Sequence, residues 1–235
     1  MRVAVIPARG GSKRIPRKNI RSFHSKPIIA WSIDAALESG CFARVLVTTD
    51  DGEIAAVARE YGAETPFVRP PELSDDLCGT VPVIAHAVQW LEAQGEALEE
   101  VCCIYATAPF LKAEDLRRGL TALQATAADY AFSVTSYAFP IQRALRLEHD
   151  QRVTMLQPEH EQTRSQDLVE AWHDAGQFYW GRAASWKQNL PLFGANSAPV
   201  ILPRHRVQDI DTLEDWERAE LMFEALSRSE TSASV

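Results

Sequence analysis

The residues best suited to chemistry in this sequence follow its first predicted strand, residues 3–6, where cations and glycines succeed an apolar run. Arginine binds phosphate oxygens through forked hydrogen bonds, and lysine binds them as a point charge. Gly10 and Gly11 can adopt positive φ angles and bring backbone N–H groups close to an anion. The segment is therefore predicted to bind a polyphosphate. Its cations are Arg9, Lys13, Arg14, Arg17 and Lys18.

The spacing of this segment excludes two common phosphate loops. The sequence has neither the GxxxxGK[ST] pattern of a P-loop nor the GxGxxG pattern of a dinucleotide-binding turn. A solvated basic loop is the alternative interpretation of any such cluster of cations. Asn19 and the run at 26–29, Lys-Pro-Ile-Ile, follow the cluster at a defined distance, which favours the binding interpretation.

Asp209 and Asp211 form a second candidate for chemistry. They lie two positions apart on or beside a strand predicted at 207–210, so their carboxylates should project from one face. Mg²⁺ binds through one or two carboxylates together with substrate phosphates, and the pair is therefore a candidate magnesium site. In the alternative interpretation, Asp211 and Thr212 form the turn and N-cap of the last helix.

Composition and charge limit the class of protein. The 235 residues carry a formal net charge of −8, which argues against a nucleic-acid surface and makes the basic segment a local feature suited to a small anion. The four cysteines form no CxxC pair, so neither a zinc site nor a disulfide framework is expected. No signal-peptide pattern and no apolar run of about 20 residues is present, which predicts a cytoplasmic protein without a membrane partner.

Apolar runs alternate with helical patterns along the chain, which predicts an α/β fold with a mostly parallel, Rossmann-like sheet between two layers of helices. The polar candidates follow the ends of strands, at the edge where ligands bind in such sheets. Strands are predicted at 3–6, 45–49, 101–105, 130–134 and 207–210, and helices at 27–39, 53–61, 81–94, 114–124 and 213–226. Regular α/β structure is expected to resume near 175–180.

Two segments depart from the alternating pattern. Residues 137–172 are short, polar pieces interrupted by proline, and they are interpreted as an arm inserted into a single domain of residues 1–228. Residues 229–235 are predicted to be a disordered tail.

The first segment and its continuation, IPARGGSKRIPRKNI and KPIIAWSI, resemble the N-terminal signature of the CMP-sugar synthetases, which activate nine-carbon acidic sugars with CTP. The resemblance covers residues 2–226 and implies a nucleotidyltransferase fold, a homodimer, and Mg²⁺ held by Asp209 and Asp211. Arg9, Lys13 and the two aspartates would be catalytic. The nucleotide-binding residues implied are Ala8, Arg9, Gly10, Gly11, Ser12, Lys13, Lys18 and Asn19 on the first segment, and Arg69, Cys78 and Thr80 for cytosine.

The resemblance also suggests a sugar site in the second half of the chain. Arg164 is a natural bidentate partner for a sugar carboxylate. Gln166, Asp174 and Gln177 could form hydrogen bonds with hydroxyl or acetamido groups of the sugar. Tyr179 could pack on its apolar substituents, and the arm could carry Arg143 toward the sugar site of a partner subunit.

The choice of sugar depends on the segment YATAPFL, residues 105–111. The sialic acid enzymes usually have QPTSPLR there, so Tyr105 replaces an amide and Leu111 replaces an arginine. Together with the segments SYAFPIQRAL, TRSQDL and HDAGQFYW, this departure makes the chain most similar to the branch that acts on pseudaminic acid. Sialic or legionaminic acid as substrate is one alternative, and a catalytically silent nucleotide-binding regulatory protein is another.

Overall fold

The computed structural model describes residues 1–233, and the side chains of residues 1–229. Its six-stranded sheet has the strand order β10-β6-β9-β5-β1-β4, in which only β9 runs antiparallel to its neighbours. The predicted α/β fold with a mostly parallel sheet is confirmed. The sheet strands are β1 (Arg2–Pro7), β4 (Arg44–Thr48), β5 (Glu100–Ile104), β6 (Tyr130–Ser136), β9 (Trp172–Arg182) and β10 (Ser197–Ile201).

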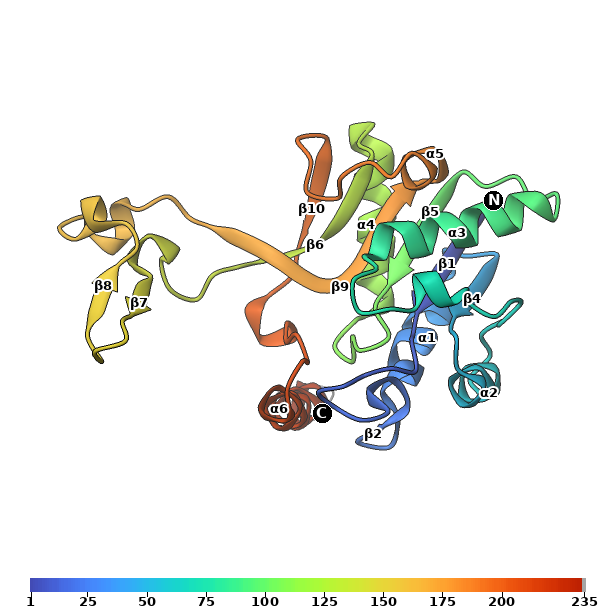
Figure 1. Ribbon diagram of the computed structural model, residues 1–235, viewed down its shortest axis with the longest axis horizontal. Coiled ribbons are helices and arrows are strands. Elements are labelled where there is room, and N and C mark those ends of the chain that lie inside the picture. Colours follow the sequence, from blue (N-terminus) through green and yellow to red (C-terminus); the bar gives the residue numbers. More distant parts are fainter. Residues whose placement is uncertain (234–235) are drawn as a thin grey trace.

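Helices cover both faces of the sheet (Figure 1). Because both faces are buried, the inner strands are almost continuously apolar rather than alternating. The helices α1 (Ile28–Ser39), α2 (Gly52–Glu60) and α4 (Ala113–Thr126) pack on one face, and α3 (Thr80–Ala93) and α5 (Ala183–Lys187) pack on the other.

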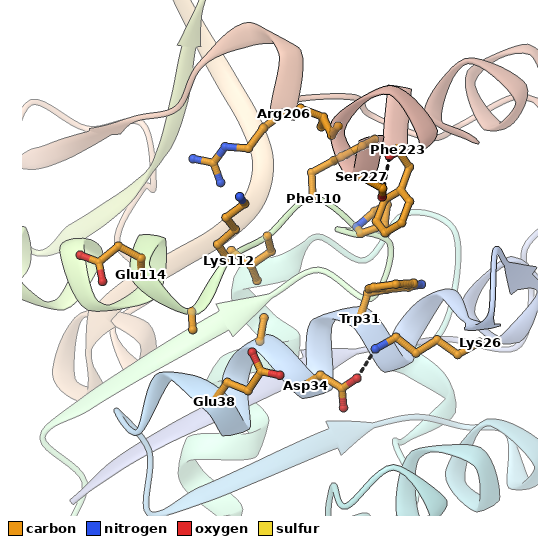
Figure 2. Close-up of a pocket in the computed structure, with 15 residues that line it drawn as sticks. Lys26, Trp31, Asp34, Glu38, Phe110, Lys112, Glu114, Arg206, Phe223 and Ser227 are labelled. Carbon is orange, nitrogen blue, oxygen red and sulfur yellow. Dashed lines mark hydrogen bonds and ion pairs between the residues drawn. The ribbon is translucent and has the colours of Figure 1, made fainter. Parts of the chain in front are cut away.

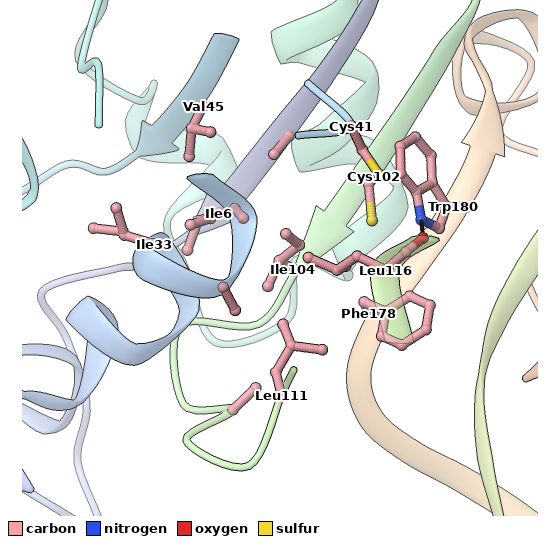
Figure 3. Close-up of a cluster of buried hydrophobic side chains, with 14 of the residues drawn as sticks. Ile6, Ile33, Cys41, Val45, Cys102, Ile104, Leu111, Leu116, Phe178 and Trp180 are labelled. Carbon is pink, nitrogen blue, oxygen red and sulfur yellow. Dashed lines mark hydrogen bonds between the residues drawn. The ribbon is translucent and has the colours of Figure 1, made fainter. Parts of the chain in front are cut away.

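A glycine brings α4 close to the strand that it covers. A Cβ at Gly119 would lie 2.6 Å from side-chain atoms of both Phe178 and Trp180. The close approach lets the Trp180 indole donate a 3.0 Å hydrogen bond to the backbone oxygen of Leu116 (Figure 3). Phe178 and Trp180 are fully buried.

The prediction of a last strand at residues 207–210 is wrong. These residues have no regular structure, and the sheet is completed instead by β10, which pairs in parallel with β6. Ile210 is buried in a separate cluster with Phe110 and Trp216, so its side chain packs against α6 (Leu213–Ala233) rather than the sheet. The argument that Asp209 and Asp211 share a face of a strand therefore fails.

Residues between β6 and β9 project away from the sheet (Figure 1). They contain the small antiparallel pair β7 (Leu145–Leu147) and β8 (Val153–Met155), joined to the rest by short 3₁₀ turns. Many large apolar side chains of this projecting segment are exposed, among them Phe139, with an exposed fraction of 83%, and Val169, with 81%.

The final helix is longer than expected. It continues to Ala233, into the segment 229–235 for which a disordered tail was predicted, and residues 234–235 lie outside the described part of the chain. The extension has neither glycine nor proline to end the helix, and Arg228 pairs with Glu224 one turn earlier. Among residues 1–233, no helix is both long and apolar enough to cross a membrane.

Candidate active site

A cleft of about 530 Å³ lies at the carboxyl ends of β1 and β5. It brings together ten of the residues predicted to act on nucleotide, metal or sugar. Segments far apart in the sequence meet there because the carboxyl ends of neighbouring parallel strands lie at one edge of a sheet. The predicted residues that line it are Arg9, Ser12, Lys13, Lys18, Asn19, Arg69, Cys78, Thr80, Tyr105 and Asp211.

The glycine pair supports the basic segment in a different way from that predicted. Neither Gly10 nor Gly11 has a positive φ angle. A Cβ at Gly10 would lie 2.7 Å from a carboxylate oxygen of Asp51, and the Gly10 N–H donates a 2.9 Å hydrogen bond to Asp50. Gly10 therefore allows the loop after β1 to contact the loop after β4, because any side chain there would collide with Asp51.

Arg17 turns away from the cleft and strengthens the same contact. Its guanidinium forms hydrogen bonds of 2.5 and 3.0 Å to Asp51 and also pairs with Glu53. Asp51 accepts hydrogen bonds from two N–H groups at the start of α2 as well. The Arg17 hydrogen bond, with those backbone donors, lowers the pKa of Asp51 to about 2.

Arg9 and Lys13 face the cleft, but an acidic residue of the same chain holds them. Arg9 contacts one carboxylate oxygen of Asp76 at 2.6 Å, and Lys13 pairs with the other. These contacts lower the pKa of Asp76, with the Lys13 hydrogen bond as the largest cause. Nothing in the sequence near Asp76 indicates these partners, which lie 67 and 63 positions earlier in the chain.

The side of the cleft predicted to read cytosine is built around a buried arginine. Arg69 is only 4% exposed, and its guanidinium donates to the side-chain and backbone oxygens of Thr48 at the end of β4. Burial lowers the pKa of Arg69. Cys78 and Thr80 lie beside it at the start of α3, and burial raises the pKa of the Cys78 thiol.

The acidic segment, defined here as residues 209–211 with Asp209 and Asp211, comes from near the C-terminal end of the sequence and reaches the cleft through Asp211. Asp211 forms ion pairs with Arg14 at 2.9 Å and Lys18 at 3.4 Å. Asp209 lies just outside the cleft lining, and partial burial together with the negative charge of Asp211 raises its pKa. Thr212 is the N-cap of α6, because its hydroxyl accepts a hydrogen bond from the Asp215 N–H, and the Asp215 carboxylate accepts hydrogen bonds from the Asp211 and Thr212 N–H groups in return. The alternative interpretation of Asp211 and Thr212 as the turn and N-cap of the last helix is therefore confirmed.

Aromatic hydroxyl groups connect the cleft to β9. The Tyr105 hydroxyl lies 3.0 Å from the Thr80 hydroxyl, and the rings of Tyr105 and Tyr179 are 5.2 Å apart. Tyr179 donates a hydrogen bond to Asp174. Gln177 is 3% exposed and donates through its side-chain amide to the backbone oxygen of Arg206, so it anchors the loop that leads to Asp209.

Three predicted sugar residues lie in the projecting segment and do not reach this cleft. Arg164 forms a bidentate pair with Asp167, at 2.6 and 3.1 Å. Arg143 donates to the backbone oxygen of Thr163, and Gln166 is exposed nearby. Ala8, Gly10 and Gly11 belong to the basic segment but do not line the cleft either.

A second cavity, of about 480 Å³, lies between α1, α6 and the loop before α4 (Figure 2). Its aromatic wall is formed by Trp31, Phe110 and Phe223. The charges at its rim are partly neutralised within the protein, since Lys26 pairs with Asp34 and Arg206 pairs with Asp115 outside the lining. None of the predicted site residues lines this cavity.

Comparison with known proteins shows the family to which this chain belongs. The sequence model of the Cytidylyltransferase family matches residues 3–216, and the chain belongs to that family. It is 43% identical to the pseudaminic acid cytidylyltransferase of Campylobacter jejuni over 94% of this chain and 95% of that protein. It is 31% identical to the CMP-N,N'-diacetyllegionaminic acid synthase of Legionella pneumophila, over 94% and 96% respectively.

A solved structure shows the same fold. A CMP:2-keto-3-deoxy-manno-octonic acid synthetase, complexed with CTP, superimposes with a TM-score of 0.68 at 17% identity, over 95% of this chain and 98% of the other. The predicted membership of the CMP-sugar synthetases and the predicted cytidylyltransferase class are confirmed.

Proposed function

We propose that this protein transfers CMP from CTP to the anomeric hydroxyl group of pseudaminic acid and releases pyrophosphate. The observation that carries the proposal is the cleft in which phosphate-binding cations, the buried Arg69 and the acidic segment meet. The relation to the Campylobacter jejuni enzyme supports the choice of sugar. Activity on sialic or legionaminic acid is less well supported, because the identities to those enzymes are lower.

The reaction forms a bond from the sugar hydroxyl oxygen to the α-phosphorus and breaks the bond to the β-phosphate. Phosphoryl-type transfer of this kind depends on positioning and on neutralising charge. Arg9, Ser12, Lys13 and Lys18 would hold the phosphates, while Arg69 and Thr80 would contact cytosine. Asn19 is held beside them by its 2.9 Å hydrogen bond to the backbone oxygen of Arg9, which orients its amide at the cleft floor.

The acidic segment fits a magnesium ion. Asp209 and Asp211 offer hard carboxylate oxygens next to the cations that would hold the phosphates, and the raised pKa of Asp209 reflects burial and the nearby charge of Asp211. Among the described residues, no group of three or more acidic, histidine or cysteine ligands converges on one point. Bound there with substrate phosphates as further ligands, Mg²⁺ would offset negative charge and increase the acidity of the sugar hydroxyl.

The sugar would bind beside Tyr105, with Asp174 and Tyr179 behind it. The hydrogen bond between Tyr179 and Asp174 fixes both groups, and Tyr105 offers a ring and a hydroxyl where the sialic acid enzymes usually have an amide. These groups suit pseudaminic acid, which carries a second acetamido group and a terminal methyl group.

The projecting segment would complete the site in a homodimer. Residues 137–172 would act as a dimerisation arm on a single domain of residues 1–228, and would carry Arg143 toward the sugar site of the partner. The exposed apolar side chains of this arm support the proposal, because burying them against a second copy would remove them from water.

Pyrophosphate release tests the function directly. The purified protein is incubated with CTP, Mg²⁺ and either pseudaminic acid or N-acetylneuraminic acid. Release only when both CTP and sugar are present is expected, and Lys13→Ala should reduce turnover by about 10²-fold with the fold intact. Binding of CTP without release with any nine-carbon acidic sugar would instead favour the silent regulatory protein.

A further inference from the structure

The contact between Asp76 and the two cations of the cleft assigns a role to this acidic residue. Arg9 and Lys13 each bind a different oxygen of the Asp76 carboxylate. A carboxylate with two oxygens on two cations reproduces the arrangement in which a phosphate group would be bound. Asp76 therefore occupies the place on Arg9 and Lys13 that a phosphate group of CTP would take.

Asp76 is not needed to shape its own loop. The neighbouring Asp75 accepts the hydrogen bonds of the Leu77 and Cys78 N–H groups, at 2.9 and 2.7 Å, and so caps the turn. The Asp76 side chain is 43% exposed and makes its described polar contacts with the two cations. Substitution of Asp76 would therefore remove the ion pairs and leave the backbone hydrogen bonds of the turn in place.

We propose that Asp76 is a positioning residue that holds Arg9 and Lys13 until the incoming triphosphate displaces it. The proposal rests on the proposed binding of CTP in this cleft. Between turnovers the carboxylate keeps the two cations directed into the cleft, and its return to them helps pyrophosphate to leave. A ligand that binds only after such displacement has a weaker apparent affinity, in proportion to the fraction of molecules in the open state.

The cost of displacement is modest, because the pairs are accessible to solvent. Exposed ion pairs contribute little each, so losing two of them should change affinity by about three- to tenfold. Salt screens exposed charges, so the effect should shrink as ionic strength rises. The same factor should apply to CTP, pyrophosphate and inorganic tripolyphosphate, since each must displace the same carboxylate.

Asp76→Asn tests the proposal through a gain of affinity. Titration calorimetry with tripolyphosphate and with CTP, without sugar, is expected to show about three- to tenfold tighter binding than in the parent at low salt. Inhibition of turnover by pyrophosphate should strengthen by a similar factor. Asp76→Glu retains the charge and should stay near the parent. A residue with only a structural role would lose affinity on substitution, not gain it.

Glu92→Gln is the matched control. Glu92 pairs with Lys187 at 2.9 Å with comparable exposure, between α3 and α5 and outside the cleft lining, and the change adds the same unit of net charge. Unchanged or weaker polyphosphate binding in Asp76→Asn, or an equal gain in Glu92→Gln, would overturn the inference. Whatever the result for these variants, the proposed function stands if the parent protein binds CTP. A parent protein that does not bind CTP would refute both the proposed function and the role of Asp76.

Discussion

Lys18 donates a 2.6 Å hydrogen bond to the backbone oxygen of Ile210, although the two residues are 192 positions apart in the sequence. Ile210 is completely buried, and its neighbour Asp211 pairs with the same ammonium group. Lys18 therefore fixes the segment of Asp209 and Asp211 against the basic segment after β1. Arg14 supports the same connection through its 2.9 Å ion pair with Asp211.

Replacement of Lys18 by Met should lower turnover by about tenfold or more. The change removes the hydrogen bond to Ile210 and the charge-assisted contact proposed with phosphate, while the buried side chain of Ile210 still packs. Steady-state pyrophosphate release measures the effect, and thermal unfolding shows that the fold persists. Lys187→Met, which removes a lysine paired with Glu92 outside the cleft, is the control. Parent-like turnover of Lys18→Met would rule out this role.

Asp209→Asn and Asp211→Asn should each lose the magnesium-dependent activity. An amide of the same shape removes the negative charge that favours a divalent cation. Rates measured across a magnesium titration, and in excess EDTA for the parent, test the expectation. Asp150→Asn, in the exposed turn between β7 and β8, should behave as the parent. Full parent activity in EDTA would contradict a metal at this site.

Tyr105 should determine the preference for the sugar. The parent is expected to use pseudaminic acid with a kcat/KM at least about a hundredfold higher than N-acetylneuraminic acid, because polar groups left unpaired by the wrong sugar are costly. Tyr105→Gln should narrow that ratio. Tyr105→Phe keeps the ring and removes the hydroxyl beside Thr80, which separates the two contributions. Equal use of both sugars by the parent would exclude the pseudaminate assignment.

Asp51→Asn should destabilise the protein in a manner that depends on pH. The pKa of Asp51 is lowered to about 2 in the folded state, below its unfolded value, so the stabilisation is present above about pH 4 and is lost as the pH falls toward 2. After allowance for solvent screening, about 1 kcal/mol is expected near pH 6. Urea unfolding at pH 6 and pH 3 measures the difference between variant and parent, which should be smaller at pH 3.

The arm should hold two copies together. Phe139→Asp and Leu147→Asp place charges on side chains that are 83% and 66% exposed in the single chain, so they should leave its fold intact and weaken a dimer. Sedimentation of the parent at micromolar concentration is expected to give a dimer and that of the double variant a monomer. A monomeric parent with full activity would refute the dimeric site.

Sequence patterns were sufficient for most of the elements and for the basic segment. Helices and strands with strong periodicity, such as α1 and β5, lie within one or two residues of their predicted bounds, because burial on one side of a helix or both sides of a strand imposes a local pattern. The basic segment, proposed to bind phosphate, was recognisable because its glycines, its cations and Asn19 lie close together in the chain. Such features need no knowledge of distant partners.

Long-range packing decided the rest. Whether residues 207–210 or Ser197–Ile201 formed the last strand depended on whether Ile210 was buried by the sheet or by Trp216 of α6, and both sequences are short and partly apolar. Gly10 is required by the approach of Asp51, which lies 41 positions later, and not by its own φ angle. The sequence around Asp76 gives no sign of a binding partner, and only the folded chain brings its carboxylate into contact with Arg9 and Lys13. The sequence by itself determined which side chains could bind phosphate. Only the tertiary structure decided which carboxylates pair with those cations, because such ion pairs join residues that are distant in the sequence and meet only in the folded chain.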